Sequence, residues 1–162
     1  MIFNLDTQGE PGNSRIIHFR PPRIALVLLF LVGLLHWAVP ISRQTLFSDP
    51  VIGVGLLVAG FTIMIWSWWL FRLAGTAVCP TARSSKLVTR GPFAWSRNPM
   101  YLGIVGMLSG VSVCVGTLPF FCAVAAYGLI LNNLFCPYEE QKLERELGEP
   151  YLRYKRRVRR WL

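Results

Sequence analysis

Three long stretches of the chain contain no charged residue. No Asp, Glu, Lys or Arg occurs from Ile24 to Ser42, from Pro50 to Phe71, or from Asn98 to Tyr138. Because about 20 apolar residues in a helix cross the roughly 30 Å core of a bilayer, the first two stretches each predict one transmembrane helix. The third has 41 residues (98 through 138) and would be about 60 Å long as one helix. It must therefore fold back on itself.

The turn in this third stretch is predicted at Gly116-Thr117 with Pro119, since glycine admits turn conformations and proline suits the start of a helix. The fold class is therefore predicted to be all-α: an integral membrane protein with four transmembrane helices and a cytoplasmic, amphipathic C-terminal helical segment. The polar first residues predict a flexible arm. The expected boundaries are an arm over 1–20 and one domain over 21–162, with transmembrane helices about 24–40, 51–71, 99–116 and 118–136, then C-terminal helices over 137–162.

Basic residues flank the predicted spans on one side. The loop between the second and third helices has five Lys or Arg and no acidic residue, and the tail after Tyr138 has eight. Lys and Arg favour the cytoplasmic face, so we expect a multi-pass protein with both termini cytoplasmic, in the inner membrane of a bacterium or the endoplasmic reticulum of a eukaryote. The formal charge of +9 could serve a nucleic acid, but anionic lipid headgroups explain it more simply.

The composition, with the positions of cysteine and histidine, limits the fold class and the kinds of site that this chain can form. Apolar residues make up 53% and charged ones 15%. A soluble globular protein of this composition would have too few polar residues to cover its surface. The four cysteines form no CxxC pair and the two histidines, His18 and His36, are far apart. Buried, inert cysteines are the better interpretation, and no metal site is predicted.

A specific polar loop, Thr89 to Gly103, separates the two halves of the chain. Gly91-Pro92 predicts a turn, and Asn98-Pro99 a second break at which a new helix starts. Phe93, Trp95 and the cation Arg97 lie between these breaks. Such a loop, at the mouth of a transmembrane helix, indicates a binding site.

The following helix presents glycine on one face. Gly103, Gly106 and Gly110 recur at three- and four-residue spacing, which predicts close packing against another helix. The second helix contains Gly53, Gly55 and Gly60, which favour the same close approach.

The tail predicts a helix that starts at Pro137 and ends at Gly148. Glu139 and Glu140 share a face with Leu143 in its first turn. These carboxylates either cap the helix or meet a cation or polar ligand. Beyond the helix, Tyr151, Tyr154, Val158 and Trp161 line one side, which predicts an amphipathic helix on anionic lipid.

Two motifs carry a family resemblance. The first is Gly-Pro-Phe followed by Ser-Arg-Asn-Pro-Met-Tyr-Leu-Gly, within 91–103, and the second is the run from Glu139 to the C-terminus. In this order they resemble the signatures of the isoprenylcysteine carboxyl methyltransferase and phospholipid methyltransferase superfamily. Gly75-Thr76 with Pro80 is a weaker match.

The resemblance implies S-adenosylmethionine as cofactor and methyl donor. It implies a site between the central loop, the third transmembrane helix and the C-terminal helix. The residues implied for the cofactor are Lys86, Leu87, Val88, Phe93, Asn98, Pro99, Met100, Tyr101, Glu139 and Glu140, and those implied for catalysis are Arg97, Asn98, Glu139 and Glu140.

Two departures bear on the acceptor. The family's usual histidine before proline is Asn98 here, which keeps hydrogen bonding but cannot titrate. The carboxyl methyltransferases also place an arginine shortly before the glutamates, where this chain has Asn132-Asn133. A substrate carboxylate would then need Arg97 or Arg145.

The leading hypothesis is a membrane methyltransferase for a lipophilic small-molecule or prenylated acceptor, with carboxylate O-methylation as the first case. Phospholipid amine or thiol methylation is the alternative, and an amine would need a glutamate as base. A non-catalytic four-helix membrane scaffold is the competing class, and a sterol-reductase-like enzyme a more distant one. Partners expected are the bilayer with anionic headgroups, with no nucleic acid and no metal.

Overall fold

A computed structural model describes residues 21–39, 44–75 and 87–162. The predicted arm over 1–20 and Lys86 lie outside these residues. The described ranges are helical, with two isolated β-bridges and no strand among them, so the all-α prediction is confirmed for this part of the chain. The elements are α2 (Pro21–Ala38), α3 (Pro50–Ala74), the 3₁₀ turn η2 (Gly91–Ala94), α4 (Pro99–Val115), α5 (Leu118–Ile130), the π-helical η3 (Leu131–Phe135), α6 (Cys136–Leu147) and α7 (Glu149–Arg157).

Apolar helices occupy all four predicted membrane regions. In the described part of the chain, α2, α3 and the continuous helix Leu118–Leu147 are long and apolar enough to cross a membrane. The apolar α4 has 17 residues, which is about 25 Å at 1.5 Å per residue. The helical content of the prediction is thus confirmed, with three helices of full spanning length and a shorter fourth.

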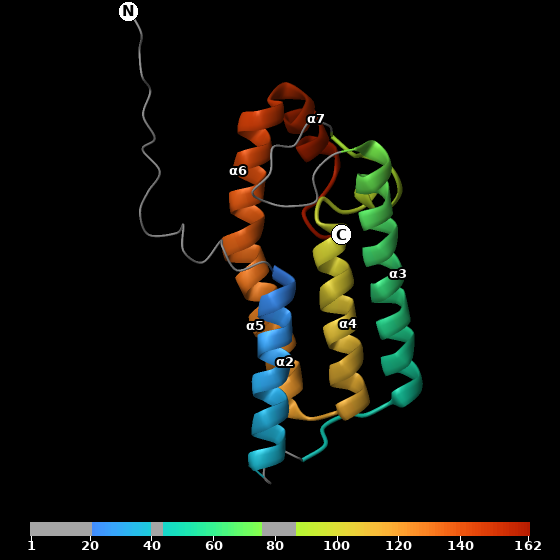
Figure 1. Cartoon of the computed structure of the whole chain (residues 1–162), viewed down its shortest axis with the longest axis vertical. Coiled ribbons are helices and arrows are strands. Elements are labelled where there is room, and N and C mark those ends of the chain that lie inside the picture. The colour runs from blue at the N-terminus through green and yellow to red at the C-terminus, as the bar shows by residue number, and fades with distance from the viewer. Residues whose placement is uncertain (1–20, 40–43, 76–86) are drawn as a thin grey trace, which may run out of the picture.

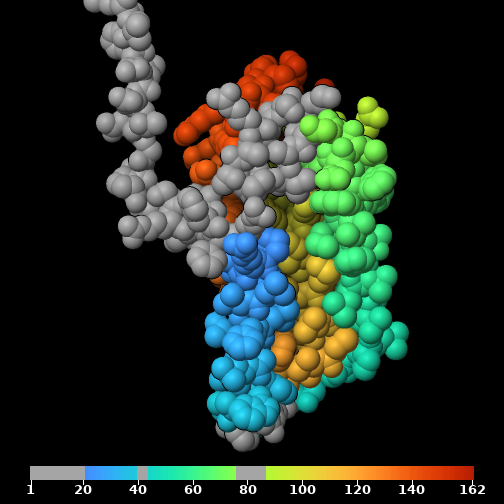
Figure 2. Space-filling model, in the orientation of Figure 1, coloured from blue at the N-terminus to red at the C-terminus, as the bar shows by residue number. Residues whose placement is uncertain are grey.

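Helix α4 lies at the centre of the bundle. It packs along α3 and also against α5 and α2, and in the space-filling view its atoms show between α2 and α3 (Figure 2). It has the largest set of buried residues of any helix in the described ranges. The helices run alternately up and down, and α6, α7 and the C-terminus gather at one end, above the start of α4 (Figure 1).

The predicted glycine packing is confirmed, and its partner is α3. A Cβ added at Gly103 would lie 2.6 Å from the carbonyl oxygen of Gly60, and one at Gly110 would lie 2.6 Å from that of Gly53. Gly106 is less tight, because its nearest neighbour would be Gly60 Cα at 3.3 Å. Backbone therefore packs directly on backbone along this interface.

Gly103→Ala should therefore destabilise the protein by about 1–3 kcal/mol, as overpacking does when the obstructing atom is backbone. The expectation of close packing at Gly55 is wrong, because a Cβ there meets nothing within 4 Å. Gly55→Ala is therefore the control, and alanine is the better helix former by up to about 1 kcal/mol. Thermal unfolding in detergent measures both variants. Equal midpoints for the two would contradict the close contact.

The end of the bundle opposite α7 is closed by a turn at Gly116. Gly116 has φ 76°, which favours glycine, and its carbonyl accepts from Leu46 N at 2.7 Å. The carboxylate of Asp49 caps α3 by accepting from Val51 N and Ile52 N. The predicted hairpin turn is thus confirmed.

The helix does not break at the boundary expected near residue 136, where α6 begins. The helix continues from α5 through η3 into α6 without a break, although Pro137 lacks an N–H and its ring would clash with the carbonyl of residue 133 in a regular α-helix. The π-helical turn changes the spacing just before this proline, and Cys136 N bonds the carbonyl of Leu131, five residues earlier. The widened turn thus lets the helix pass the proline.

The C-terminal helix is also shorter than expected. Helix α7 ends at Arg157, and Val158 has an extended backbone (φ −116°, ψ 132°). Gly148, at φ 60°, separates α6 from α7, as predicted. The expected amphipathic helix through Trp161 is therefore wrong beyond Arg157. Tyr151 and Tyr154 are 1% and 7% exposed, so this face packs on protein.

Candidate functional site

The central loop is held on the end of α3 by aromatic contacts. Phe93 meets Phe71 edge-on with ring centroids 5.0 Å apart, and Trp95 meets Trp66 at 6.2 Å. Gly91 has φ 59°, and a Cβ there would approach the Trp66 ring to 3.2 Å, so both backbone and space require glycine. These contacts fix the loop just ahead of Arg97.

The last residues of the chain form a short parallel pairing with this loop. Ser96 and Arg159 form a β-bridge, and Arg97 N donates to the Arg159 carbonyl at 2.9 Å. The carbonyl of Arg160 accepts from Ser96 Oγ at 3.1 Å and from Asn98 Nδ2 at 3.3 Å. We call residues 158–162 the C-terminal segment. It binds the loop through backbone groups on both sides of Arg97.

Glu140 of α6 is the anionic centre of the site. Its carboxylate accepts a fork from Arg160, with Nε to Oε1 at 2.8 Å and Nη2 to Oε2 at 3.1 Å. Arg97 Nη2 lies 3.3 Å from Oε1, and Lys155 Nζ lies 3.6 Å from Oε2. The carboxylate is 7% exposed. Three cations from three chain segments therefore meet on one buried carboxylate, and Lys155 also bonds Glu144.

The π-helical turn supplies a second anchor for the C-terminal segment. Asn132 Oδ1 accepts from Arg160 Nη1 at 3.2 Å and from Trp161 Nε1 at 3.1 Å. Arg160 thus bridges the π-helical turn and Glu140, two turns further along the same helix. The hydrogen bonds that Arg160 donates to Glu140 raise the pKa of Arg160, so its guanidinium stays charged.

Two buried tyrosines of α7, Tyr151 and Tyr154, pack at the site, and Tyr154 bonds the central loop. The Tyr154 hydroxyl donates to the carbonyl of Phe93 at 2.7 Å, and burial raises its pKa. Burial also raises the pKa of Tyr151 to about 12. Both hydroxyls therefore remain protonated, and Tyr154 keeps its donor to the loop at neutral pH.

Glu139, although adjacent in sequence, points to a different partner. The Tyr101 hydroxyl of α4 donates to Glu139 Oε1, and Tyr101 is 9% exposed. Among the described residues no ion pair within 4.0 Å reaches Glu139. The two glutamates therefore differ: Glu140 is neutralised by three cations at close range, whereas Glu139 bonds the neutral Tyr101 hydroxyl and has Lys142 only as a more distant cation.

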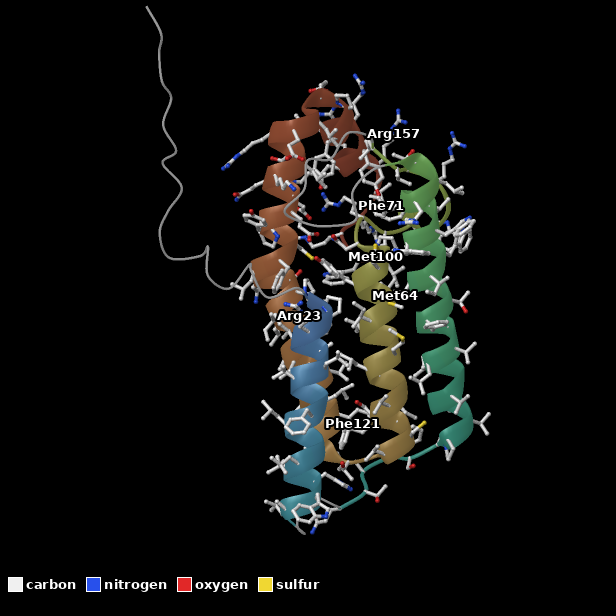
Figure 3. The ribbon with its side chains drawn as sticks, viewed as in Figure 1. Arg23, Met64, Phe71, Met100, Phe121 and Arg157 are labelled. Carbon is white, nitrogen blue, oxygen red and sulfur yellow. The ribbon has the colours of Figure 1, made fainter. Side chains whose placement is uncertain are left out.

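The structure brings together Arg97, Asn98, Tyr101, Glu139 and Glu140 of the predicted set. Pro99 is buried and Met100 partly buried in the first turn of α4, and the labelled Met100 lies below the polar side chains of α6 and α7 (Figure 3). Phe93 is nearby, but its ring packs on α3. Leu87 and Val88 are partly buried and lead into η2.

The sequence reasoning missed Arg160, Lys155 and Asn132 as members of the site. The eight basic residues of the tail give no signal that distinguishes Arg160 from its neighbours. Asn132 does carry a signal, because a polar side chain at the end of an apolar helix requires a partner. Among the described residues, no group of three or more His, Cys, Asp or Glu could hold a metal ion.

Comparison with known proteins defines the class of this membrane protein. The phospholipid methyltransferase family matches residues 49–149, which is more than half of the chain. The chain therefore belongs to the phospholipid methyltransferase family, and the resemblance inferred from the two motifs is confirmed. The match runs from the start of α3 into the start of α7 and includes the loop and both glutamates.

One curated relative is an uncharacterized protein of Haemophilus influenzae. It is 35% identical over 63 residues, which is 39% of this chain and the whole of that protein. No solved structure matches the chain.

Proposed function

We propose that this protein is an S-adenosylmethionine-dependent membrane methyltransferase that acts on a lipid acceptor at the cluster of Arg97, Asn98, Glu139 and Glu140. The observation that carries the proposal is the contact between the motif loop and the glutamate pair, 38 residues apart in sequence, through Tyr101 and Glu139. The family match supports methyl transfer as the reaction. We place the site at the cytoplasmic face, where the basic loop and tail meet.

The residues present fit the methyl donor in charge and hydrogen bonding. Glu139 offers a carboxyl that could accept from an ammonium or a ribose hydroxyl. Arg97 offers buried N–H groups without an acceptor among the described residues, and these suit a carboxylate. The sulfonium supplies a methyl group that is already activated, so the protein has mainly to align the acceptor and exclude water.

A phospholipid amine is the acceptor we favour, because the chain belongs to the phospholipid methyltransferase family. A protonated amine must lose a proton before it can attack. Glu139 has no ion pair within 4.0 Å among the described residues, so it is the carboxylate of the cluster available to take that proton. Glu140 is unsuited to this role because Arg160 already occupies both of its oxygens.

Carboxylate O-methylation is the second candidate, and Arg97 is the observation that favours it. Its free N–H groups could hold a lipid carboxylate in place of the arginine that this chain lacks before the glutamates. A carboxylate needs no base. However, a guanidinium that neutralises it also lowers its nucleophilicity, so the arginine would position the acceptor more than activate it.

Glu139→Gln tests the proposed site. If Glu139 binds the donor, the loss of a charge-assisted hydrogen bond of about 1.5–3 kcal/mol should weaken S-adenosylmethionine roughly tenfold to over a hundredfold. If it is the base, affinity stays and methyl transfer to phosphatidylethanolamine falls. Calorimetry and transfer of a labelled methyl group, with phosphatidylethanolamine and prenylcysteine as acceptors, separate these roles.

Glu146→Gln is the matched control, since Glu146 lies on the same helix in an i,i+4 pair with Lys142 and should change neither quantity. Parent protein that binds no S-adenosylmethionine would refute the proposed function. Unchanged affinity and rate in folded Glu139→Gln would return Glu139 to a capping role.

A further inference from the structure

Arg97 is a buried guanidinium with unused hydrogen-bond donors. Its side chain is 10% exposed, and its Nη2 faces Glu140 Oε1 at 3.3 Å. Its Nε and Nη1 have no hydrogen-bond partner among the described residues. Guanidinium has five N–H bonds in a rigid fork, and buried donors without acceptors are rare in folded proteins because each costs free energy. An acceptor is therefore expected at this position.

Glu140 does not satisfy these donors. Its two oxygens already accept the fork from Arg160, and Lys155 lies near Oε2. The connected ion pairs of the cluster join Arg97, Lys155 and Arg160 to Glu140 and Glu144, and none of them uses Nε or Nη1 of Arg97. These two buried, unused donors of Arg97 call for an oxyanion.

The surroundings of Arg97 place it beside the reacting groups. Its backbone N–H is fixed by Arg159. The next residue, Asn98, directly precedes α4, and Tyr101 in the first turn of this helix bonds Glu139. Glu140 faces Nη2 and the Tyr151 hydroxyl also bonds the guanidinium, yet Nε and Nη1 remain without an acceptor among the described residues. An arginine rather than a lysine, with its remaining donors buried, suits an oxyanion with several acceptor oxygens.

We propose that the guanidinium of Arg97 is the binding subsite for an oxyanion of a reactant: the phosphodiester of the lipid acceptor or the carboxylate of the methyl donor. This subsite rests on the proposed function and assigns it a specificity-determining residue. Both groups present oxygens that accept from a guanidinium. With phosphate as the ligand, the subsite selects phospholipids over neutral lipids.

Ligands that lack the oxyanion test the subsite on the unmodified protein in detergent. One arm compares S-adenosylmethionine with its decarboxylated analogue by calorimetry. The other compares dihexanoyl phosphatidylethanolamine with dihexanoylglycerol, which lacks the phosphate, by the shift in thermal unfolding midpoint. Removing the oxyanion that binds Arg97 should weaken binding about tenfold to a hundredfold. The arm in which this occurs identifies the source of the oxyanion.

Arg97→Gln should abolish the preference for the oxyanion-bearing ligand in that arm, and Arg97→Lys, which keeps a cation beside Glu140, should retain part of it. Arg153→Gln is the matched control, because Arg153 is exposed on α7 and should leave both preferences unchanged. If Arg97→Gln does not fold, the ligand comparison on the parent and on Arg97→Lys still decides.

Equal binding with and without the oxyanion in both arms would overturn the subsite. So would a preference that persists in Arg97→Gln. Failure of the parent to bind S-adenosylmethionine would refute the proposed function separately, and the lipid arm would then decide the subsite alone.

Discussion

Glu140→Gln should destabilise the protein by about 3–5 kcal/mol, the cost of breaking a buried ion pair by removing one partner. The carboxylate accepts the fork from Arg160 and faces Arg97 and Lys155. Glutamine keeps the shape but removes the charge, and it offers an N–H₂ group to a guanidinium that has only donors. Three cations would then lie together with less compensation. Against a typical total stability of about 5–15 kcal/mol, this is a large fraction.

Thermal or denaturant unfolding in detergent measures this loss, and Glu149→Gln is the control. Glu149 pairs with Arg156 at 3.1 Å, but the two side chains are 57% and 65% exposed. An exposed pair contributes about 0–1 kcal/mol, so this variant should unfold close to the parent. Similar small shifts for both glutamates would show that Glu140 is not the centre that holds the loop, α6 and the C-terminal segment together.

The helical fold follows from the sequence to a large extent, because its signals are local. The uncharged stretches predict apolar helices by length alone, and Gly116 predicts the hairpin because few other residues adopt its φ of 76°. The sequence likewise predicts that the glycine face of α4 packs closely against another helix. It does not predict which helix, because Gly53 and Gly60 meet Gly103 and Gly110 only in three dimensions.

At two places the helices continue or end differently from what the local sequence indicates, and the two cases have a common origin. Pro137 usually marks a helix start, and here a π-helical turn compensates for it. The apolar side of α7 suggested a lipid surface, yet Tyr154 donates to the Phe93 carbonyl and the chain leaves the helix after Arg157. In both cases a tertiary or backbone partner, invisible in the local pattern, determines the outcome.

The candidate site, too, can be predicted only in part from the sequence. Motif spacing brings the central loop and both glutamates into consideration, but it treats Glu139 and Glu140 as equivalent. The structure separates them, because Glu140 faces three cations and Glu139 faces the Tyr101 hydroxyl. Which glutamate stabilises the fold and which remains for a ligand depends on side chains that lie about 20 and 40 residues away in sequence.

Arg160→Gln is expected to loosen the C-terminal segment from the loop and to destabilise the protein by about 2–3 kcal/mol, within the range for hydrogen bonds to charged groups. Arg160 holds both oxygens of Glu140 and also bonds Asn132. Its loss leaves Glu140 with only the longer contacts to Arg97 and Lys155. Because the carbonyl of the same residue accepts from Ser96 and Asn98, the loop should lose order along with the segment.

Arg159→Gln is the matched control one residue earlier. The side chain of Arg159 is exposed, and only its backbone carbonyl holds the loop, through Arg97 N, so glutamine preserves that contact. Hydrogen exchange of the amides from Ser96 to Asn98 measures the order of the loop, and the unfolding midpoint measures the stability of the protein. Arg160→Gln should raise exchange at these amides and lower the midpoint, while Arg159→Gln should change neither. Equal exchange in the two variants would mean that the backbone pairing holds the loop without the guanidinium, and Arg160 would then be one more surface cation of the basic tail.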